Sequence, residues 1–222
     1  MKTLVEIQEK LKLNTDKHKM SGKYSKPTDH TYLPEYDKLF KKYKYESINI
    51  LEIGVLDGSS LNLWAEYFPN AKIYGADIFE RIKEGGSFLS VKNKTSKYKN
   101  ISLHVVDSVN EKDINPNNGR EKLFEILGKE KFHIIIDDGD HKPTSQLKTF
   151  NNFIGKLHSD GLYIIEDIWD WDEKLNHRDQ NTSQTGLEYL QKNIPELEII
   201  NMNDRCGKYR DNILGIYKKT NN

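Results

Sequence analysis

The stretch His-Ile-Ile-Ile-Asp-Asp-Gly-Asp-His, residues 133–141, decides the fold that we expect for this chain. Its first half is apolar and β-branched, which is typical of a strand buried on both faces of a sheet. The strand runs directly into charged residues, namely Asp137, Asp138, Asp140 and His141. Because ligands of open α/β sheets bind at the carboxyl ends of the strands, we expect a functional site at this edge.

A second apolar segment ends in the same way. Leu162–Ile165 is followed by Glu166 and Asp167, so several carboxylates converge if the two strands are neighbours. Two like charges at ~4 Å repel each other by about 4 kcal/mol at an effective dielectric constant of ~20, and a cation between them removes that repulsion. The sequence therefore predicts a divalent metal site beside a histidine that can act as a base.

A glycine-containing turn follows the first predicted strand, Ile48–Ile53, and leads into a predicted helix. Gly54 lets the backbone approach a ligand, and the start of the helix offers unpaired N–H groups, so the layout is that of a nucleotide-type pocket. Gly54 and Gly58 give the spacing G-x-x-x-G, so both the G-x-G-x-x-G dinucleotide fingerprint and the phosphate-loop pattern are absent. A nicotinamide-dependent oxidoreductase is disfavoured for that reason.

Asp77 ends the second predicted strand, Lys72–Ala76, and lies about 20 residues beyond Gly54. An acid at this place can accept hydrogen bonds from both hydroxyls of a ribose, and an ordinary strand-end aspartate facing water is the alternative. The third predicted strand, residues 101–106, ends in Asp107 and Ser108.

The order of the predicted elements indicates a parallel sheet with a hairpin at its end. Strands alternate with helices up to residue 165, and this order favours parallel strands joined by right-handed crossovers. The last two predicted strands, residues 197–201 and 212–217, are separated by about ten residues, which is too few for a helical crossover. They are therefore expected to pair antiparallel.

The N-terminal part consists of two predicted helices and an intervening polar loop. Leu4, Ile7 and Leu11 recur at helical spacing, and residues 32–43 form a second amphipathic pattern. The polar stretch at residues 14–30 is either a solvated connector or a lid over the site, because long polar loops in compact domains are often functional. We therefore distinguish an N-terminal helix and lid segment, residues 1–45, from one compact unit, residues 46–222.

Two other segments have more than one interpretation. Trp169 and Trp171 lie among acids directly beyond the second acidic strand end. They either pack on the adjacent loop or form a stacking floor for a sugar ring or another flat substrate. The lysine- and arginine-rich run at residues 81–99 is interpreted as a solvated face, with contact to an acidic substrate as the alternative.

Charge and cysteine content limit the classes of function. The 222 residues include 34 basic and 34 acidic ones, so nothing in the total charge predicts a nucleic-acid or membrane partner. The single cysteine, Cys206, excludes an internal disulfide and fits a reducing compartment, so we expect a cytoplasmic protein. Residues 1–12 do not form a signal peptide, and no apolar run reaches the ~20 residues that span a bilayer.

Read together, these motifs resemble those of a known enzyme class. Glu52, Gly54, Gly58, Asp77 and Asp107 resemble the pattern of class I S-adenosylmethionine-dependent methyltransferases. This resemblance implies an α/β, Rossmann-like fold, in which a seven-stranded, mostly parallel sheet has helices on both faces and an antiparallel C-terminal hairpin. Residues 46–222 would form the S-adenosylmethionine-binding domain.

A narrower resemblance rests on the acidic strand ends and on the N-terminal loop. Ile135-Ile136-Asp137-Asp138-Gly139-x-His141 and Ile164-Ile165-Glu166-Asp167 resemble the metal-dependent sugar O-methyltransferases of macrolide biosynthesis, the mycinamicin and macrocin type. Thr15-Asp16-Lys17 and His30-x-Tyr32 resemble the N-terminal segment of that family.

The resemblance implies a role for each matching residue. His141 would be the general base and Asp138 its catalytic partner, and Mg²⁺ would be held by Asp138, Glu166 and Asp167. S-adenosyl-L-methionine would contact the turn from Glu52 through Gly54 to Gly58 with Ser60, the ribose-binding Asp77, the adenine-flanking Asp107 and Ser108, and also Thr15 and Asp138.

The function that we expect is therefore a Mg²⁺-dependent transfer of a methyl group from S-adenosylmethionine to a hydroxyl of a saccharide or glycosylated metabolite. A small-molecule or saccharide acceptor is the expected partner, without nucleic acid or membrane, and assembly into a homo-oligomer stays open. Two alternatives remain at this point. One is an O-methyltransferase acting on a catechol or a polyketide, and the other is a catalytically retired binding module with the same fold.

Overall fold

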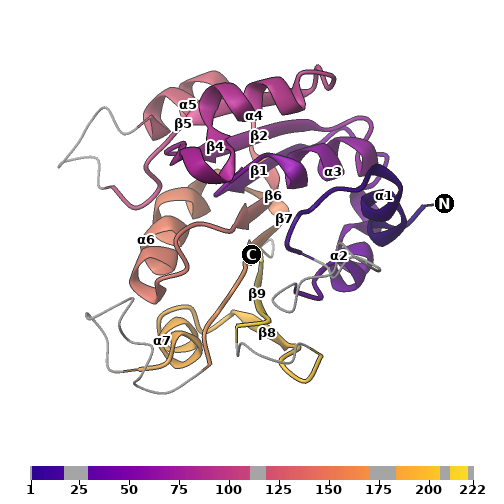
Figure 1. Cartoon of the computed structure of the whole chain (residues 1–222). Coiled ribbons are helices and arrows are strands. Elements are labelled where there is room, and N and C mark those ends of the chain that lie inside the picture. Colours follow the sequence, from indigo (N-terminus) through magenta and orange to yellow (C-terminus); the bar gives the residue numbers. More distant parts are fainter. Residues whose placement is uncertain (1, 18–29, 111–118, 171–183, 206–210, 220–222) are drawn as a thin grey trace.

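The computed structural model describes residues 2–17, 30–110, 119–170, 184–205 and 211–219 (Figure 1). One seven-stranded sheet forms its centre, with the strand order β5-β2-β1-β6-β7-β9-β8. Neighbouring strands from β5 to β7 run parallel, whereas β9 pairs antiparallel with β7 and β8 antiparallel with β9. The predicted fold class, including the closing hairpin, is confirmed.

The strands of the central sheet are β1 (Asn49–Ile53), β2 (Lys72–Asp77), β5 (Ile101–Val105), β6 (Phe132–Asp137), β7 (Leu157–Ile165), β8 (Glu198–Asn201) and β9 (Ile213–Lys218). The helices are α1 (Leu4–Leu11), α2 (Leu33–Phe40), α3 (Ser59–Tyr67), α4 (Phe88–Thr95), α5 (Arg120–Leu127), α6 (Pro143–Phe153) and α7 (Gly186–Asn193). Short 3₁₀ turns follow α2 at Lys41–Tyr43, precede α4 at Ile82–Glu84 and follow α6 at Ile154–Lys156.

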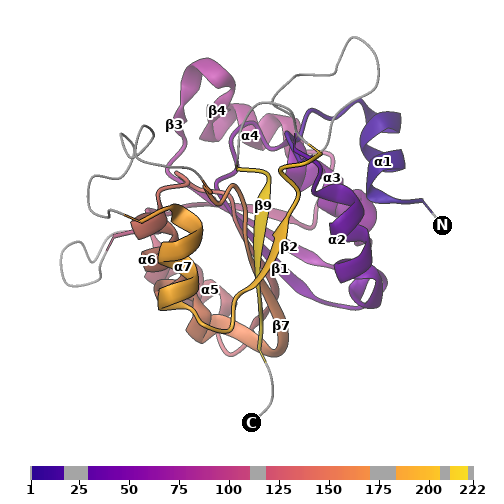
Figure 2. The same cartoon turned by 90° about the horizontal axis from the view of Figure 1, so that it is seen from below.

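The helices form two layers, one on each face of the sheet. Figure 2 shows α1, α2 and α3 on one side and α5, α6 and α7 on the other. Alternate residues of the central strand β6 supply the two cores, because successive side chains of a strand point to opposite faces. Ile134 and Ile136 belong to the core beneath α1–α3, and Ile135 belongs to the core beneath α5–α7. Burial on both faces explains the continuous apolar run that precedes Asp137.

The N-terminal helices are part of this packing. Thr3 caps α1 through a capping box with Glu6, and the backbone N–H of Leu4 donates to the carboxylate of Asp37 in α2 at 3.1 Å. Leu4 and Tyr36 are fully buried in the same hydrophobic cluster as the sheet. The division of the chain at residue 45 stays a prediction.

Two elements differ from the sequence-based expectation. The run at residues 81–99 contains the small hairpin β3 (Glu80–Arg81) and β4 (Gly86–Ser87), followed by α4, none of which the charge pattern indicated. Only Val91 and Thr95 of α4 are buried, so its apolar signal is too short to recognise. Its lysines are exposed, in agreement with a solvated face.

The last parallel strand also begins earlier than expected. The apolar segment that predicted this strand begins at Leu162, but β7 begins at Leu157 and runs through Asp160 and Gly161. The pairing of β6 with β7 shifts register between Phe132 and Ile134, which accommodates the extra length. Among the described residues, no helix is both long enough and apolar enough to cross a membrane.

Gly54 marks the place where the ends of β1 and β6 come closest. It has a left-handed φ of +85°, and a Cβ atom added to it would lie 1.9 Å from the carbonyl oxygen of Asp138. We expect Gly54→Ala to lower the free energy of unfolding by roughly 3 kcal/mol or more, because it combines this clash with backbone strain.

Urea denaturation of wild type and variant measures this loss. Gly155→Ala is the matched control, because a Cβ at Gly155 meets no atom within 4 Å. Its effect should stay within about 1 kcal/mol. Equal stabilities of the two variants would contradict the close approach at Gly54.

Candidate active site

The two acidic strand ends meet, as the sequence-based metal prediction requires. β6 and β7 are parallel neighbours, with Asp137 opposite Ile165. The backbone N–H of Glu166 donates to the carbonyl of Asp137 at 3.0 Å, and that of Asp138 donates to Ile53 of β1 at 2.8 Å. Three strand ends are thus joined directly below the carboxylates.

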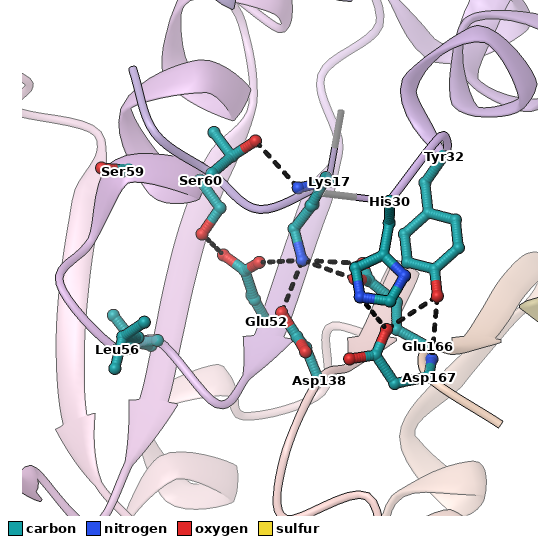
Figure 3. Close-up of polar contacts among 12 residues, drawn as sticks. Lys17, His30, Tyr32, Glu52, Leu56, Ser59, Ser60, Asp138, Glu166 and Asp167 are labelled. Atoms are coloured by element: carbon teal, nitrogen blue, oxygen red, sulfur yellow. Dashed lines mark hydrogen bonds and ion pairs between the residues drawn. The ribbon is translucent and has the colours of Figure 1, made fainter. Parts of the chain in front are cut away.

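Lys17 lies at the centre of these carboxylates (Figure 3). Its Nζ is 2.6 Å from Oδ2 of Asp138, 2.8 Å from both carboxylate oxygens of Glu166 and 3.3 Å from Oε1 of Glu52. The lysine side chain is only 1% exposed. A buried charge needs partners of opposite sign, and these acids supply them.

Glu52 and Glu166 have further partners on the α1–α3 side of the sheet. The hydroxyl of Ser60 and the indole N–H of Trp64 donate to Oε2 of Glu52 at 2.7 and 3.1 Å. The hydroxyl of Tyr36 donates to Oε1 of Glu166 at 2.6 Å. Both carboxyls are fully buried, and burial raises the pKa of each despite the nearby ammonium of Lys17.

A second group of ligand atoms faces away from Glu52. Asp138, His141 and Asp167 each offer one metal-ligating atom, and these atoms lie within 4.8 Å of one another. The imidazole of His141 bridges the two acids, with Nε2 3.1 Å from Oδ1 of Asp138 and Nδ1 3.4 Å from Oδ2 of Asp167. All three side chains are partly accessible, being 12–25% exposed.

The backbone at this group is strained. His141 and Asp167 have φ values of 60° and 55°, in the left-handed region that residues other than glycine rarely adopt. Such conformations cost of order 1–3 kcal/mol each and cluster at functional sites. Here they turn one imidazole and one carboxylate toward the same point.

Asp167 is held in place by residues that precede α2. The hydroxyl of Tyr32 donates to Oδ1 of Asp167 at 2.7 Å, and Nε2 of His30 lies 3.5 Å from the same oxygen. The ring of His30 stacks on that of Tyr32 with a centroid distance of 4.8 Å. One oxygen of Asp167 is therefore occupied, and the other faces His141.

The charges around His141 set its protonation. Burial alone would lower the pKa of His141, but the carboxylates of Asp167 and Asp138 outweigh it and raise that pKa to about 10. Burial would raise the pKa of Asp138, yet Lys17 and His141 together lower it to about 2. Without a further cation, the imidazole is therefore protonated at neutral pH and the carboxyl of Asp138 is charged.

The donor set fits a hard dication. Mg²⁺ prefers oxygen ligands and binds through one or two carboxylates while keeping several waters. Asp138 and Asp167 present such oxygens at a partly accessible place. They lie next to the imidazole of His141 and stabilise its protonated form. The predicted third ligand, Glu166, lies beside this pair, with Nζ of Lys17 at 2.8 Å from both of its carboxylate oxygens. Its role as a metal ligand stays a prediction.

The predicted cofactor residues line the adjacent β1–α3 turn, on the side of Glu52. Gly54 and Gly58 both have positive φ, so the chain turns sharply above the sheet. Asp77 Oδ2 accepts hydrogen bonds from the backbone N–H groups of Val55 at 2.7 Å and Leu56 at 3.3 Å. Oδ1 of Asp77 also accepts from the backbone N–H of Phe79 at 2.7 Å. The carboxylate thus orders the turn, and among the described contacts one lone pair of Oδ1 stays available to a ligand.

The other predicted cofactor residues are placed around this turn and the end of β5. Asp107 accepts from the backbone N–H of Val109 at 3.2 Å, and the hydroxyl of Ser108 lies 3.1 Å from that of Thr149 in α6. Thr15 donates from its hydroxyl to Gln8 and accepts from the backbone N–H of Lys17, so it orders the segment that carries the lysine.

Several residues of the site were not predicted to contact the acids. Lys17, His30 and Tyr32 were noted only within the N-terminal segment that resembles the family, and Tyr36 lay within the predicted amphipathic helix at residues 32–43. The residue types themselves were the available signal. A buried cluster of carboxylates needs a positive charge and hydrogen-bond donors, which lysine and tyrosine side chains supply.

The structure describes only some of the other residues that were singled out in the sequence. Trp169 is 5% exposed, which agrees with packing on the adjacent loop. Trp171, Cys206 and most of the proposed lid, residues 18–29, lie outside the described residues. Asp140 is exposed and pairs with Lys142 at 3.3 Å.

The raised pKa of His141 predicts a pH-dependent stability in the presence of a chelator. Its charged form is favoured in the folded state, so the stabilisation is fully present below about pH 6.5 and is lost as the pH rises through about 10. The difference in unfolding free energy between wild type and His141→Gln should therefore be larger at pH 6 than at pH 10.5, by up to roughly 4 kcal/mol. Denaturant titrations at both pH values measure it, and a pH-independent difference would contradict the assigned contacts.

The chain is similar to known methyltransferases in sequence and in structure. No protein-family model matches the chain. It is 27% identical over 219 residues to the mycinamicin VI 2''-O-methyltransferase of Micromonospora griseorubida, covering 91% of this chain and 50% of the relative. It is 26% identical over 188 residues to the 8-demethyl-8-alpha-L-rhamnosyl tetracenomycin-C 2'-O-methyltransferase of Streptomyces olivaceus, covering 81% and 44%. The chain thus spans about half the length of these curated relatives.

Among solved structures, the MycE methyltransferase of the mycinamycin pathway, in complex with Mg and SAH, is similar with a TM-score of 0.65. The sequence identity is 23%, and the match covers 99% of this chain and 55% of that one. The resemblance noted in the sequence is confirmed: the relatives are O-methyltransferases of the mycinamicin and tetracenomycin type, and the chain has the Rossmann-like fold of the methyltransferases.

Proposed function

We propose that this chain is a Mg²⁺-dependent O-methyltransferase that transfers the methyl group of S-adenosylmethionine to a hydroxyl of a sugar. One observation supports it above all. Asp138, His141 and Asp167 converge beside the β1–α3 turn, so a metal-type cluster and a nucleotide-type turn share one edge of the sheet. The relatives named above, one of which acts on a rhamnosyl compound, favour a sugar acceptor.

Asp138 and Asp167 are residues that would hold Mg²⁺, together with Glu166 as the predicted third ligand. When bound, the ion would neutralise charge on these carboxylates, orient neighbouring hydroxyls of the acceptor and stabilise a developing alkoxide. Glu166, the third carboxylate expected from the sequence, lies next to this pair but on the side of Lys17.

His141 is the residue that would remove the proton of the acceptor hydroxyl. A sugar hydroxyl is a poor nucleophile because it holds its proton tightly, and a positioned base contributes roughly 10²–10⁴-fold to such a step. Asp167 and Asp138, the first acids that raise the pKa of His141, are both proposed ligands, so neutralising them brings the imidazole toward its ordinary pKa near neutrality. Metal binding and base strength are thereby coupled.

The cofactor would occupy the β1–α3 turn. Gly54 and Gly58, both with positive φ, would let the backbone come close to the cofactor. Ser60 and Glu52, which hydrogen-bond to each other, would contact its methionine part, and Asp77 would contact its ribose. Asp107 and Ser108 would flank the adenine, and Thr15 and Asp138 complete the proposed set. Methyl transfer then needs in-line placement of the sulfonium and the hydroxyl, so positioning supplies much of the rate.

A retired binding module is the second candidate. It is favoured by Lys17, because this ammonium already compensates three of the carboxylates without a metal. Binding of S-adenosylmethionine without turnover on any acceptor, with or without Mg²⁺, would identify such a module. Turnover on a catechol or a polyketide but on no sugar would identify the non-sugar alternative.

We expect His141→Ala and Asp138→Ala to lower methyl transfer by at least about 10²-fold, because one removes the base and the other its partner and metal ligand. Transfer from radiolabelled S-adenosylmethionine to a panel of deoxyhexose glycosides measures this loss. The exposed Lys72→Ala, whose ammonium pairs with Glu130 at 3.3 Å, is the control. Wild-type turnover in both site variants would contradict the assignment.

Removal of divalent ions should abolish transfer while leaving cofactor binding in place. Asp138 is the one proposed metal residue that also belongs to the proposed cofactor set, and the β1–α3 turn itself is formed by other residues. Calorimetric titration with S-adenosylmethionine in the presence of a chelator should therefore keep its affinity within about threefold. Addition of MgCl₂ should restore turnover. Full activity in the chelator would refute the metal dependence.

A further inference from the structure

We propose that the edge of the sheet opposite the acidic strand ends carries a second site, which binds a small molecule through its phosphate group. A cavity of about 760 Å³ lies at this edge. It is lined by the segment that leads from α2 to β1, by the start of β6, by residues of β7 and by the end of β9. None of the residues that line it belongs to the proposed cofactor, metal or catalytic set.

The length of β6 separates this cavity from the proposed active site. His133, near the start of the strand, lines the cavity, whereas Asp138 directly follows the last residue of the strand. Each residue of a strand advances the chain by about 3.3 Å, so the two residues lie roughly 17 Å apart. The cavity is therefore a place of its own, and a ligand bound there does not depend on the proposed methyl transfer.

Two stacked histidines form part of the cavity wall. The rings of His133 in β6 and His158 in β7 have centroids 4.4 Å apart, and their planes are inclined by 15°. Nδ1 of His133 accepts a hydrogen bond from the backbone N–H of Asn49, and Nδ1 of His158 accepts one from that of Asp160, both at 3.2 Å. A neutral imidazole whose Nδ1 accepts a hydrogen bond carries its proton on Nε2. Each ring therefore offers one Nε2–H donor.

These two donors are not used within the described part of the chain. Neither Nε2 forms a hydrogen bond there, and neither belongs to the buried polar atoms that lack a partner, so both nitrogens are accessible. Burial and the neighbouring imidazole lower the pKa of His133, which favours the neutral ring. The pair thus supplies hydrogen-bond donors at neutral pH and fits a ligand that accepts hydrogen bonds.

Positive charge exceeds negative charge around the histidine pair. The lysines and acids that line the cavity are Lys38, Lys42, Lys218, Lys219, Glu46 and Asp160. Nζ of Lys42 lies 4.5 Å from the centre of the Tyr43 ring, and Nζ of Lys219 donates to the carbonyl of Leu157 at 3.0 Å. Neither of these two ammonium groups forms an ion pair with a described carboxylate, whereas the other two lysines pair with glutamates outside the lining. Two cations at the cavity are therefore available to an anion.

Neighbouring lysines add to this positive potential. Burial and the ammonium groups of Lys156 and Lys219 lower the pKa of Lys131, which precedes the start of β6. The three side chains are thus close enough to repel one another. An anion bound at this edge would relieve that repulsion, because opposite charges attract at the same distances.

A phosphate group matches these donors better than a carboxylate does. It carries between one and two negative charges at neutral pH and has three strongly accepting oxygens, whereas a carboxylate has one charge and two oxygens. The cavity volume lies within the range of roughly 300–1,000 Å³ that is usual for small-molecule sites. Leu39, Ile48 and Leu162 supply apolar surface for the rest of such a molecule. Nucleic acid fits less well, because the lysines surround one cavity and the total charge of the chain is zero.

Calorimetric titration of the full chain with uridine diphosphate, inorganic pyrophosphate and uridine tests the site. Uridine compounds are used because an adenine could enter the proposed cofactor turn, and a chelator keeps divalent ions from binding the phosphates. We expect both phosphate compounds to bind with a dissociation constant below about 1 mM, and uridine to bind at least about tenfold more weakly than uridine diphosphate. The absence of binding by both phosphate compounds up to about 10 mM would overturn the proposal.

The same titrations distinguish two kinds of phosphate ligand. Tighter binding of uridine diphosphate than of pyrophosphate would support a phosphate ester whose organic part contacts the apolar lining. Equal affinities would support recognition of the phosphate group alone, as in a site for free phosphate or pyrophosphate. Uridine binding as tightly as uridine diphosphate would overturn the proposal, because the phosphate would then contribute nothing.

Substitutions in the cavity wall locate the bound phosphate. His158→Asn keeps an acceptor near the position of Nδ1 but removes the Nε2–H donor, so it should weaken pyrophosphate binding by about tenfold. Lys42→Met removes one uncompensated ammonium and should weaken binding by about fivefold. The control is Lys92→Met, which makes the same charge change on the exposed side of α4 and should stay within about twofold of wild type.

The comparison of the two lysine variants decides whether the cavity or the overall charge is recognised. Equal losses in Lys42→Met and Lys92→Met, or wild-type affinity in Lys42→Met, would overturn the proposal. If His158→Asn does not fold, the two lysine variants decide alone, since both side chains are exposed and their loss should leave the fold intact.

Discussion

The ion pairs of Lys17 are the interaction on which the arrangement of this site depends. Parallel strands end at one edge of the sheet, so the sequence Asp137-Asp138 at the end of β6 and Glu166-Asp167 after β7 places four acids side by side. Like charges at this spacing repel, and low polarity around them increases the repulsion. One ammonium reaches three acids within 3.3 Å and makes this edge of the sheet compatible with a folded chain.

Backbone geometry then separates the acids that compensate Lys17 from those that face His141. Left-handed residues at His141 and Asp167 turn these side chains toward each other and toward Asp138. Gly54 permits β1 to approach Asp138 so closely that a side chain there would overlap its carbonyl. The metal-type cluster and the cofactor turn are neighbours because of this contact, and their proximity is what methyl transfer between two bound molecules requires.

Much of this could be predicted from the sequence, and the part that could not has a physical reason. Apolar runs followed by acids located β6, β7 and the edge at which they end, because local hydrophobic pattern and the rule for parallel sheets were sufficient. Lys17 was not assigned a role, because its acids are distant in sequence and only tertiary folding reveals a lysine as their partner. The helix α4 was missed because two buried residues do not produce a recognisable amphipathic period.

The contacts of Lys17 also affect the order in which the chain can fold. Lys17 and Glu166 are 149 positions apart, and Tyr32 and Asp167 are 135 positions apart. Closing such long loops is slow, because chain entropy is lost before the contact forms. During synthesis from the N-terminus, Lys17 is made before β7, so its contact with Glu166 can form only after β7 has left the ribosome. This acidic edge of the sheet is therefore completed late, after most of the parallel strands have been made.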